Sequence, residues 1–291
     1  MSLADTRQAP ESLAPKADDE RPTIIIQPVR GWFQLSLKNL WAYRELLYFF
    51  IWRDVKVRYK QTILGAAWAI IQPVMAMVVF TIFFGGLAKI SSEGLPYPIF
   101  NYTGLLPWQY FSLALTSTSN SLVASAGLVR KVYFPRIMVP LATTIAGLVD
   151  FAVAFVVLIG LMVFYQIVPT LSILLLPLFL LLAVVTAGGV GLWLSALNVQ
   201  YRDVRHAAPF LVQFWLFATP VVYPSSLLPE PWRTIFGLNP MVGVVEGFRW
   251  ALLGTNPPTA MIALSTIIAL IVFFSGVVYF QRVESKFADV I

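Results

Sequence analysis

The chain has 291 residues, of which 58% are hydrophobic and 12% are charged, and its formal net charge is +6. So few charged residues cannot cover the surface of a soluble protein of this size, and the composition therefore indicates an integral membrane protein. The chain has no cysteine and a single histidine, which excludes disulfide bonds, thiol chemistry and a metal site built from cysteine and histidine.

Residues 1–22 are rich in proline, alanine, aspartate and glutamate. We expect them to form a disordered cytoplasmic tail, without the apolar core of a cleavable signal peptide. In the region 23–60, residues 31–60 interleave aromatic and basic side chains, a mixture typical of the membrane headgroup region, and their apolar run at 46–52 is too short to cross. We predict cytoplasmic amphipathic helices that lie in the interface, either as an anchor or at the mouth of a pathway.

Six apolar segments follow, at about 62–88, 102–127, 137–166, 169–198, 207–224 and 259–281. Each reaches or approaches the ~20 residues that a helix needs to cross a bilayer. Of the 20 lysine and arginine residues, 17 fall on one side of these segments, which predicts that this side is cytoplasmic. We therefore predict an all-α integral membrane domain of six transmembrane helices over 61–291, with both termini in the cytoplasm. The basic clusters are explained by the orientation of the chain in the membrane and by attraction to anionic lipid. No nucleic-acid partner is therefore expected.

Two features interrupt the apolar segments. Asp150 is the only formal charge within them, and it is either a functional group or a hydrogen-bonded carboxyl that holds helices together, which we favour. The second segment carries consecutive hydroxyl and amide residues at 116–121. These residues serve helix packing or line a hydrated route, and packing is the favoured interpretation.

The stretch 224–258 is apolar but contains six prolines. Two short helices fit it, at about 230–237 and 240–253, and neither is long enough to cross. We expect re-entrant or interfacial helices that enter from outside, where protein or water satisfies their backbone. Glu246 and Arg249 are three residues apart on the second helix and are expected to form an ion pair.

Motifs for chemistry are missing from the chain. It has no G-x-x-x-x-G-K-[ST] loop for ATP, and no acid and base residues with the spacing of an enzyme active site. A single intramembrane acid and the lack of an internal repeat argue against a secondary carrier. Two short basic loops with aromatic residues, 129–136 and 198–206, either dock a cytosolic partner or only orient the chain.

Four stretches carry a resemblance to a known family. They are RDVKVRYKQT at 53–62 with its continuation to Pro73, KVYFPR at 131–136, YRDV at 201–204 leading to TPVVYP at 219–224, and LNPM at 238–241 with FAD at 287–289. The chain resembles the permease subunit of ABC exporters that move polysaccharides such as O-antigen, capsule or teichoic acid. The resemblance extends from about residue 30 to the end of the chain.

The resemblance implies a homodimer in the bacterial inner membrane that works with two cytosolic ATPase subunits. Those subunits would bind ATP and magnesium, whereas this chain would hold no cofactor and would not itself be an enzyme. The implied substrate is a long polysaccharide carried on undecaprenyl diphosphate. An ABC permease for a lipid or a drug is the alternative within the same architecture, and a membrane-embedded enzyme acting on polyprenyl-linked sugars is another.

In this family the first and fifth spans border a channel lined by aromatic rings, which stack on sugars without demanding one hydrogen-bond pattern. The matching residues here are Trp68, Gln72, Phe80, Phe84, Phe210, Phe214, Phe217 and Tyr223. The basic residues expected to meet the lipid diphosphate at the cytoplasmic gate are Arg53, Lys56, Arg58 and Lys60. The alternative for each aromatic residue is contact with lipid or packing. The alternative for the basic residues is attraction to anionic lipid.

Two further groups of residues are implied by the same resemblance. Those expected to couple to the ATPase are Arg130, Lys131, Tyr133, Phe134, Pro135, Arg136, Arg202 and Asp203. Those expected to form an external gate are Trp232, Glu246 and Arg249.

Overall fold

The computed structural model describes residues 41–60, 65–229, 231–257, 259–285 and 287, so the predicted tail 1–22 and the predicted interfacial region up to residue 40 lie outside it. Every regular element within the described ranges is helical, which confirms the all-α prediction. The longer helices are α2 (Arg44–Lys60), α3 (Gly65–Phe80), α4 (Tyr97–Ala124), α6 (Met138–Phe164), α7 (Leu176–Gln200), α8 (Val204–Phe217), α10 (Pro240–Leu253) and α11 (Thr259–Glu284). The shorter ones are the π-helix η1 (Thr81–Leu87), α5 (Ala126–Lys131), the 3₁₀ helices η2 (Leu171–Leu175) and η3 (Ser225–Leu227), and α9 (Trp232–Phe236).

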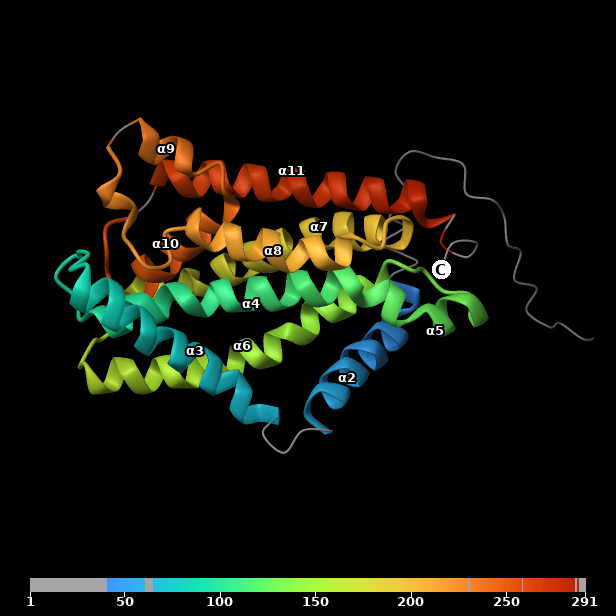
Figure 1. Cartoon of the computed structure of the whole chain (residues 1–291), viewed down its shortest axis with the longest axis horizontal. Coiled ribbons are helices and arrows are strands. Elements are labelled where there is room, and N and C mark those ends of the chain that lie inside the picture. The colour runs from blue at the N-terminus through green and yellow to red at the C-terminus, as the bar shows by residue number, and fades with distance from the viewer. Residues whose placement is uncertain (1–40, 61–64, 230, 258, 286, 288–291) are drawn as a thin grey trace, which may run out of the picture. The chain divides into compact units, whose positions relative to one another are not determined.

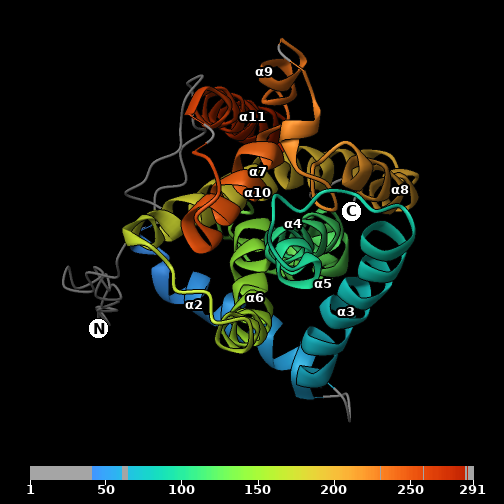
Figure 2. The same cartoon turned by 90° about the vertical axis from the view of Figure 1, so that its left-hand side faces the viewer.

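Helix α4 lies at the centre of the bundle. Helices α3, α6, α7, α8 and α10 all pack against it, and α11 packs against α7 and α10 (Figure 1 and Figure 2). Small residues let α7 approach its neighbours closely. A Cβ at Gly191 would lie 2.6 Å from Cγ2 of Thr118 on α4, and a Cβ at Gly189 would lie 2.7 Å from Cα of Phe273 on α11. The observed helix spacing therefore depends on glycine at both positions.

The polar run of α4 at 116–121 faces two kinds of surroundings. Thr118 Oγ1 lies 2.9 Å from Oγ1 of Thr144 on α6. The Asn198 amide on α7 donates to the Ser119 carbonyl oxygen at 2.9 Å and to Oδ1 of Asn120 at 3.1 Å. These side chains hold α4 to α6 and α7, as the packing interpretation expects. Other members of the run line cavities instead: Thr116, Ser117 and Ser121.

Four described helical stretches are long and apolar enough to cross a membrane: Ala67–Leu87, Met138–Phe164, Leu171–Gln200 and Ala260–Glu284. The other two predicted spans differ from these four. Helix α4 is 28 residues long, but it carries the polar run and is buried by its neighbours over most of its length. Helix α8 has 14 residues and is therefore only ~21 Å long, against ~30 Å of hydrocarbon. The structure ends this helix at Phe217, so the predicted helix over 207–224 is wrong in its second half.

The two ends of the bundle carry different elements. Helix α5 and the C-terminal end of α11 lie at one end, together with the N-terminal part of α2, whereas α9 and α10 lie at the opposite end (Figure 1). The observed α9 and α10 match the predicted short helices at 230–237 and 240–253. Asn239 caps α10, because its side chain accepts a hydrogen bond from the Met241 N–H at 3.0 Å. Gly254 ends α10 with a φ of 69°.

Helix α10 is a buried helix. Thirteen of its 14 residues are buried, and it packs against α4, α7 and α11. A helix lying flat in the membrane interface keeps one face exposed to water or headgroups. The interfacial alternative is therefore wrong for α10, and a helix enclosed by the bundle replaces it.

Candidate functional site

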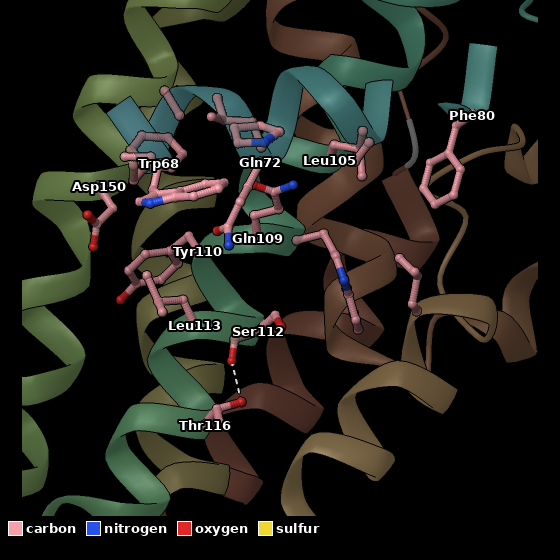
Figure 3. A pocket seen from close by; sticks show the side chains of 18 of the residues that line it. Trp68, Gln72, Phe80, Leu105, Gln109, Tyr110, Ser112, Leu113, Thr116 and Asp150 are labelled. Carbon is pink, nitrogen blue, oxygen red and sulfur yellow. Dashed lines mark hydrogen bonds between the residues drawn. The ribbon is translucent and has the colours of Figure 1, made fainter. Parts of the chain in front are cut away.

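A cavity of about 800 Å³ opens between α3, α4 and α6. Residues that recur every four positions line it from one face of α3: Trp68, Gln72, Ala76 and Phe80. Helix α4 faces them with Leu105, Trp108, Gln109, Tyr110, Ser112, Leu113 and Thr116. Figure 3 shows Asp150 of α6 at one end of this cavity and Phe80 at the other.

The side chains around this cavity are mixed in character. Trp68 and Phe80 offer apolar rings, while Gln72 and Gln109 offer amide donors and acceptors (Figure 3). Pro73 on α3 removes one helical hydrogen bond beside Gln72, which loosens the cavity wall there. Such a surface can bind a ligand that has both apolar faces and hydroxyl groups, with weak contacts repeated along its length.

An ion pair closes one end of the cavity. The Arg58 guanidinium and the Tyr59 hydroxyl on α2 both donate to the Asp150 carboxylate on α6. Burial, together with this hydrogen bond, raises the pKa of Tyr59 above its ordinary value, so the hydroxyl remains a donor. Asp150 therefore joins two helices, as the favoured interpretation of its place in the sequence expects.

Arg58 also lines a second cavity, of about 660 Å³. It is lined by Arg53, Asp54, Val57 and Arg58 of α2, and by Ser117, Ser121, Ala124, Ser125, Gly127, Leu128 and Thr143. Arg53 pairs with Asp54 at 2.8 Å, and the Thr143 hydroxyl on α6 donates to the same carboxylate at 2.9 Å. Arg58 lines both this cavity and the larger one.

The four basic residues expected at the cytoplasmic gate occupy different places. Arg53 and Arg58 line the second cavity and are both held by carboxylates. Lys56 turns away, with its ammonium group 4.1 Å from the ring centre of Trp52. Lys60 is an exposed residue at the end of α2. The structure therefore brings together the two arginines but not the two lysines.

The predicted channel residues divide between separate cavities. Phe210 and Phe214 of α8 line a third, apolar cavity of about 420 Å³, which they share with residues of α4 and α7. Phe84 packs edge-on against Phe80, with ring centres 5.6 Å apart. Phe217 is exposed, and its carbonyl oxygen accepts a hydrogen bond from the Tyr223 hydroxyl at 3.1 Å. Of α8, only Leu216 reaches the largest cavity.

The residues expected to couple to an ATPase are partly exposed and partly structural. The exposed ones are Arg130, Lys131, Tyr133, Arg202 and Asp203, and Pro135 is half-buried. Phe134 is buried against Phe50 of α2, with ring centres 5.3 Å apart. The backbone N–H of Arg136 donates to the Glu284 carboxylate at 2.9 Å, and its guanidinium donates to the Glu284 carbonyl oxygen. Arg136 therefore ties the start of α6 to the end of α11.

The expected ion pair of Glu246 and Arg249 is present, at 3.1 Å, and both side chains are buried. The Arg249 guanidinium also donates to the carbonyl oxygens of Pro220, Val221 and Tyr223 at 2.7, 2.6 and 3.2 Å. These bonds satisfy the backbone that leaves the helix after Phe217. The third predicted gate residue, Trp232, is exposed on α9.

Sequence reasoning missed Gly104 on α4. A Cβ there would lie 2.9 Å from Arg249 Nη2 and 2.9 Å from the Val221 carbonyl oxygen. A lone glycine in an apolar helix indicates close packing but not its partner, and these partners lie more than a hundred residues further along the chain. Tyr97, whose hydroxyl donates to the Val222 carbonyl oxygen at 2.6 Å, was missed for the same reason.

Residues 45–253 match the family described as "ABC-2 type transporter". The chain belongs to the ABC-2 type transporter family. The match runs from α2 through α10, so both polar cavities, the Arg58–Asp150 pair and the Arg249 cluster lie within the ABC-2 region. The resemblance seen in the sequence is thereby confirmed at the level of the family.

The chain is also similar to curated transport proteins over most of its length. The O-antigen export system permease protein RfbA of Myxococcus xanthus is 28% identical over 258 residues, which are 87% of this chain and 98% of that protein. RfbA of Klebsiella pneumoniae is 27% identical over 261 residues, which are 88% of this chain and all of that protein. The polysialic acid transport protein KpsM of Escherichia coli is 24% identical over 215 residues, 69% of this chain and 78% of KpsM.

Proposed function

We propose that this ABC-2 permease is the membrane subunit of an exporter that moves a polysaccharide of the O-antigen type, linked to undecaprenyl diphosphate, across the bacterial inner membrane. The observation that carries the proposal is the cavity of about 800 Å³ lined by aromatic and amide side chains. Flat rings and amides can bind successive sugar units weakly, which a sliding polymer requires. The full-length similarity to O-antigen export permeases supports the same substrate class.

The proposed topology has six spans and cytoplasmic termini. Four apolar helices supply four spans, and α4 supplies the fifth because its neighbours enclose its polar run. The sixth consists of α8 and residues 218–224, in which Arg249 satisfies the carbonyl groups of Pro220, Val221 and Tyr223 in place of helical hydrogen bonds. Helices α9 and α10 would then be re-entrant from the outside, and the end of the bundle carrying α5 would face the cytoplasm.

We propose that the channel forms between two copies of the chain. The α8 residues Phe210, Phe214 and Phe217 are each more than 60% exposed in the single chain. So many exposed rings on one helix need a covering surface of lipid or protein. A second copy that meets α8 and the outer face of α3 would cover them and place two sets of aromatic residues around one passage.

The energy would come from two cytosolic ATPase subunits, because the chain has no phosphate-binding loop. ATP and Mg²⁺ would be held by those subunits, and this chain would not hydrolyse ATP by itself. The exposed residues of the basic loops, above all Lys131, Tyr133 and Arg202, are the proposed contact surface. Phe134, packed on Phe50, would pass movement from that surface to α2.

Co-expression with the ATPase of the same export system tests the proposal. We expect the two chains to purify together, and ATP hydrolysis to rise with undecaprenyl-diphosphate-linked polysaccharide but not with undecaprenyl diphosphate alone. Equal stimulation by both compounds would favour transport of the lipid itself, the alternative suggested by the apolar cavity at Phe210 and Phe214. A chain that shows no association with an ATPase would remove the exporter assignment.

A further inference from the structure

We propose that the Arg58–Asp150 pair is a gate between the cavities of about 800 Å³ and 660 Å³, and that it opens when a substrate phosphate replaces the Asp150 carboxylate on Arg58. This inference rests on the proposed transport function for the identity of the phosphate, but not for the position of the gate.

The Arg58–Asp150 pair is shared between two cavities through Arg58. Arg58 lines both the cavity of about 800 Å³ and that of about 660 Å³, and Asp150 lines the larger one. The pair therefore lies where the two cavities approach each other. Separation of the two side chains would join a cavity among the helices to one that opens beside α5 and the end of α2.

Helix α2 is held in place at two separate parts of its length. Near its C-terminal end, α2 is held to α6 by Arg58 and Tyr59 on Asp150, and one turn earlier by Asp54 on Thr143. Further toward its N-terminus, α2 is fixed through Phe50, which is buried against Phe134. Loss of the Asp150 contacts would free one part of α2 while the aromatic contact keeps the other in place.

The charged side chains of the second cavity allow a phosphate group to bind by exchange. Both arginines of the second cavity already pair with carboxylates, so an anion that enters must compete for them. A phosphate group can take the place of a carboxylate on a guanidinium, because both accept the same forked pair of hydrogen bonds. Hydroxyl groups of Ser117, Ser121 and Ser125 line the same cavity and can donate to further phosphate oxygens. The ion pair is thus the closed state of a gate that recognises phosphate.

Cysteine labelling measures the gate directly, because the chain has no cysteine of its own. Ser112→Cys reports on the larger cavity and Ser125→Cys on the second cavity. The full chain, in inside-out membrane vesicles, is treated with a membrane-impermeant maleimide from the cytoplasmic side. Asp150→Asn is expected to speed labelling at position 112 severalfold, since the charge that holds the partly buried Arg58 guanidinium is removed. Labelling at position 125 should stay unchanged.

Two further variants keep this result interpretable. Asp54→Ala removes the acceptor of the Thr143 hydroxyl, and with it the neighbouring contact between α2 and α6, but leaves the Arg58–Asp150 pair, so labelling at position 112 should stay at the starting rate. Tyr59→Phe removes one of the two donors to Asp150 with little change in shape, and a smaller increase is expected. Equal labelling in the Asp150→Asn, Tyr59→Phe and unaltered chains would overturn the gate.

A lipid arm tests the exchange with phosphate. Purified full-length chain carrying Ser112→Cys is placed in vesicles that contain either undecaprenyl monophosphate or undecaprenol. The phosphate lipid is expected to speed labelling at position 112, undecaprenol is not, and Arg58→Gln should abolish the difference. Equal rates with the two lipids would refute the exchange. An equal response to inorganic phosphate would assign the opening to a free anion and refute the role of the substrate.

Neither readout requires an ATPase or a polysaccharide. If the labelling results appear as expected while the polysaccharide fails to stimulate ATP hydrolysis, the gate stands and the proposed substrate falls. If the polysaccharide stimulates ATP hydrolysis but Asp150→Asn leaves the labelling rate at position 112 unchanged, the exporter assignment stands and the gate is refuted.

Discussion

The guanidinium group of Arg249 on α10 lies over the ring of Phe100 on α4, with 3.8 Å between Cζ and the ring centre. A cation that is fully desolvated gains more from such a ring than an exposed one does. The same guanidinium binds the Glu246 carboxylate and three carbonyl oxygens of residues 220–223. One side chain thus joins α4, α10 and the segment that follows α8.

Replacement of Arg249 should destabilise the protein strongly. We expect Arg249→Met to lower the free energy of unfolding by about 3–5 kcal/mol, because Glu246 and the three carbonyl groups lose a shared partner. Arg249→Lys should recover only part of this loss, since an ammonium group cannot reproduce the planar fork. Thermal unfolding in detergent measures the effect. The exposed Arg202→Gln serves as the control, and equal melting temperatures for Arg249→Met and Arg202→Gln would contradict the assignment.

Gly104→Ala should disturb the same cluster from the α4 side. Its new Cβ would lie 2.9 Å from both Arg249 Nη2 and the Val221 carbonyl oxygen, so we expect a loss of about 1–3 kcal/mol from overpacking. Gly160→Ala on α6 is the matched control, because a Cβ there has no neighbour within 4 Å. The two variants are compared by thermal unfolding. A control that melts as low as Gly104→Ala would show that helix glycines matter here for reasons other than packing.

The basic loop 129–136 should contain some residues that dock the ATPase and others that stabilise the fold. Arg130→Glu with Lys131→Glu changes only exposed charge, so we expect normal yield and stability but weak capture of the ATPase subunit. Arg136→Glu should instead reduce the yield of folded protein, because Arg136 holds Glu284 at the end of α11. Size-exclusion yield and ATPase pull-down from the same preparations give both readouts. Normal ATPase capture by the double variant would exclude these two residues from the docking surface.

Residues of the largest cavity should affect transport more than stability. We expect Trp68→Ala to reduce export of the polysaccharide severalfold, with a small change in melting temperature, because Trp68 is 47% exposed in the single chain. Phe214→Ala, on a side chain that is 72% exposed, should behave similarly if a second copy covers it. Surface polysaccharide in a complemented deletion strain measures export. A parallel loss of folded protein would mean that these rings serve packing.

Local sequence signals were sufficient for much of the helical architecture. The boundaries of α10 follow from Asn239 and Pro240 at its start and Gly254 at its end, and these residues act within one turn of the helix. The end of α8 was missed because carbonyl groups after Phe217 bond to distant side chains: Ala218 to Asn239, Val222 to Tyr97, and three others to Arg249. An apolar run alone does not reveal that its backbone has partners other than itself.

The sites were predicted less completely than the helices. Trp68, Gln72 and Phe80 share one face by spacing, and the structure places them in one cavity. Phe210 and Phe214 also share a face, but that face lines the apolar cavity formed with α4 and α7, and spacing alone does not name the neighbouring helices. Asp150 was recognised as unusual, yet its partner Arg58 lies 92 residues away on a helix assigned to the interface. Only the folded chain reveals such a pairing.

The π-helix η1, directly after Phe80, also affects what α3 can do. A π turn holds more residues than an α turn, so the segment Thr81–Leu87 stores extra chain directly after Phe80, the last residue of α3 that lines the cavity of about 800 Å³. Tightening by one residue would swing every later side chain around the axis by about 100° without unwinding the helix. The packing of Phe84 on Phe80 would change with that rotation. Rewinding of η1 would therefore turn Phe84 relative to Phe80 while α3 itself stays in place.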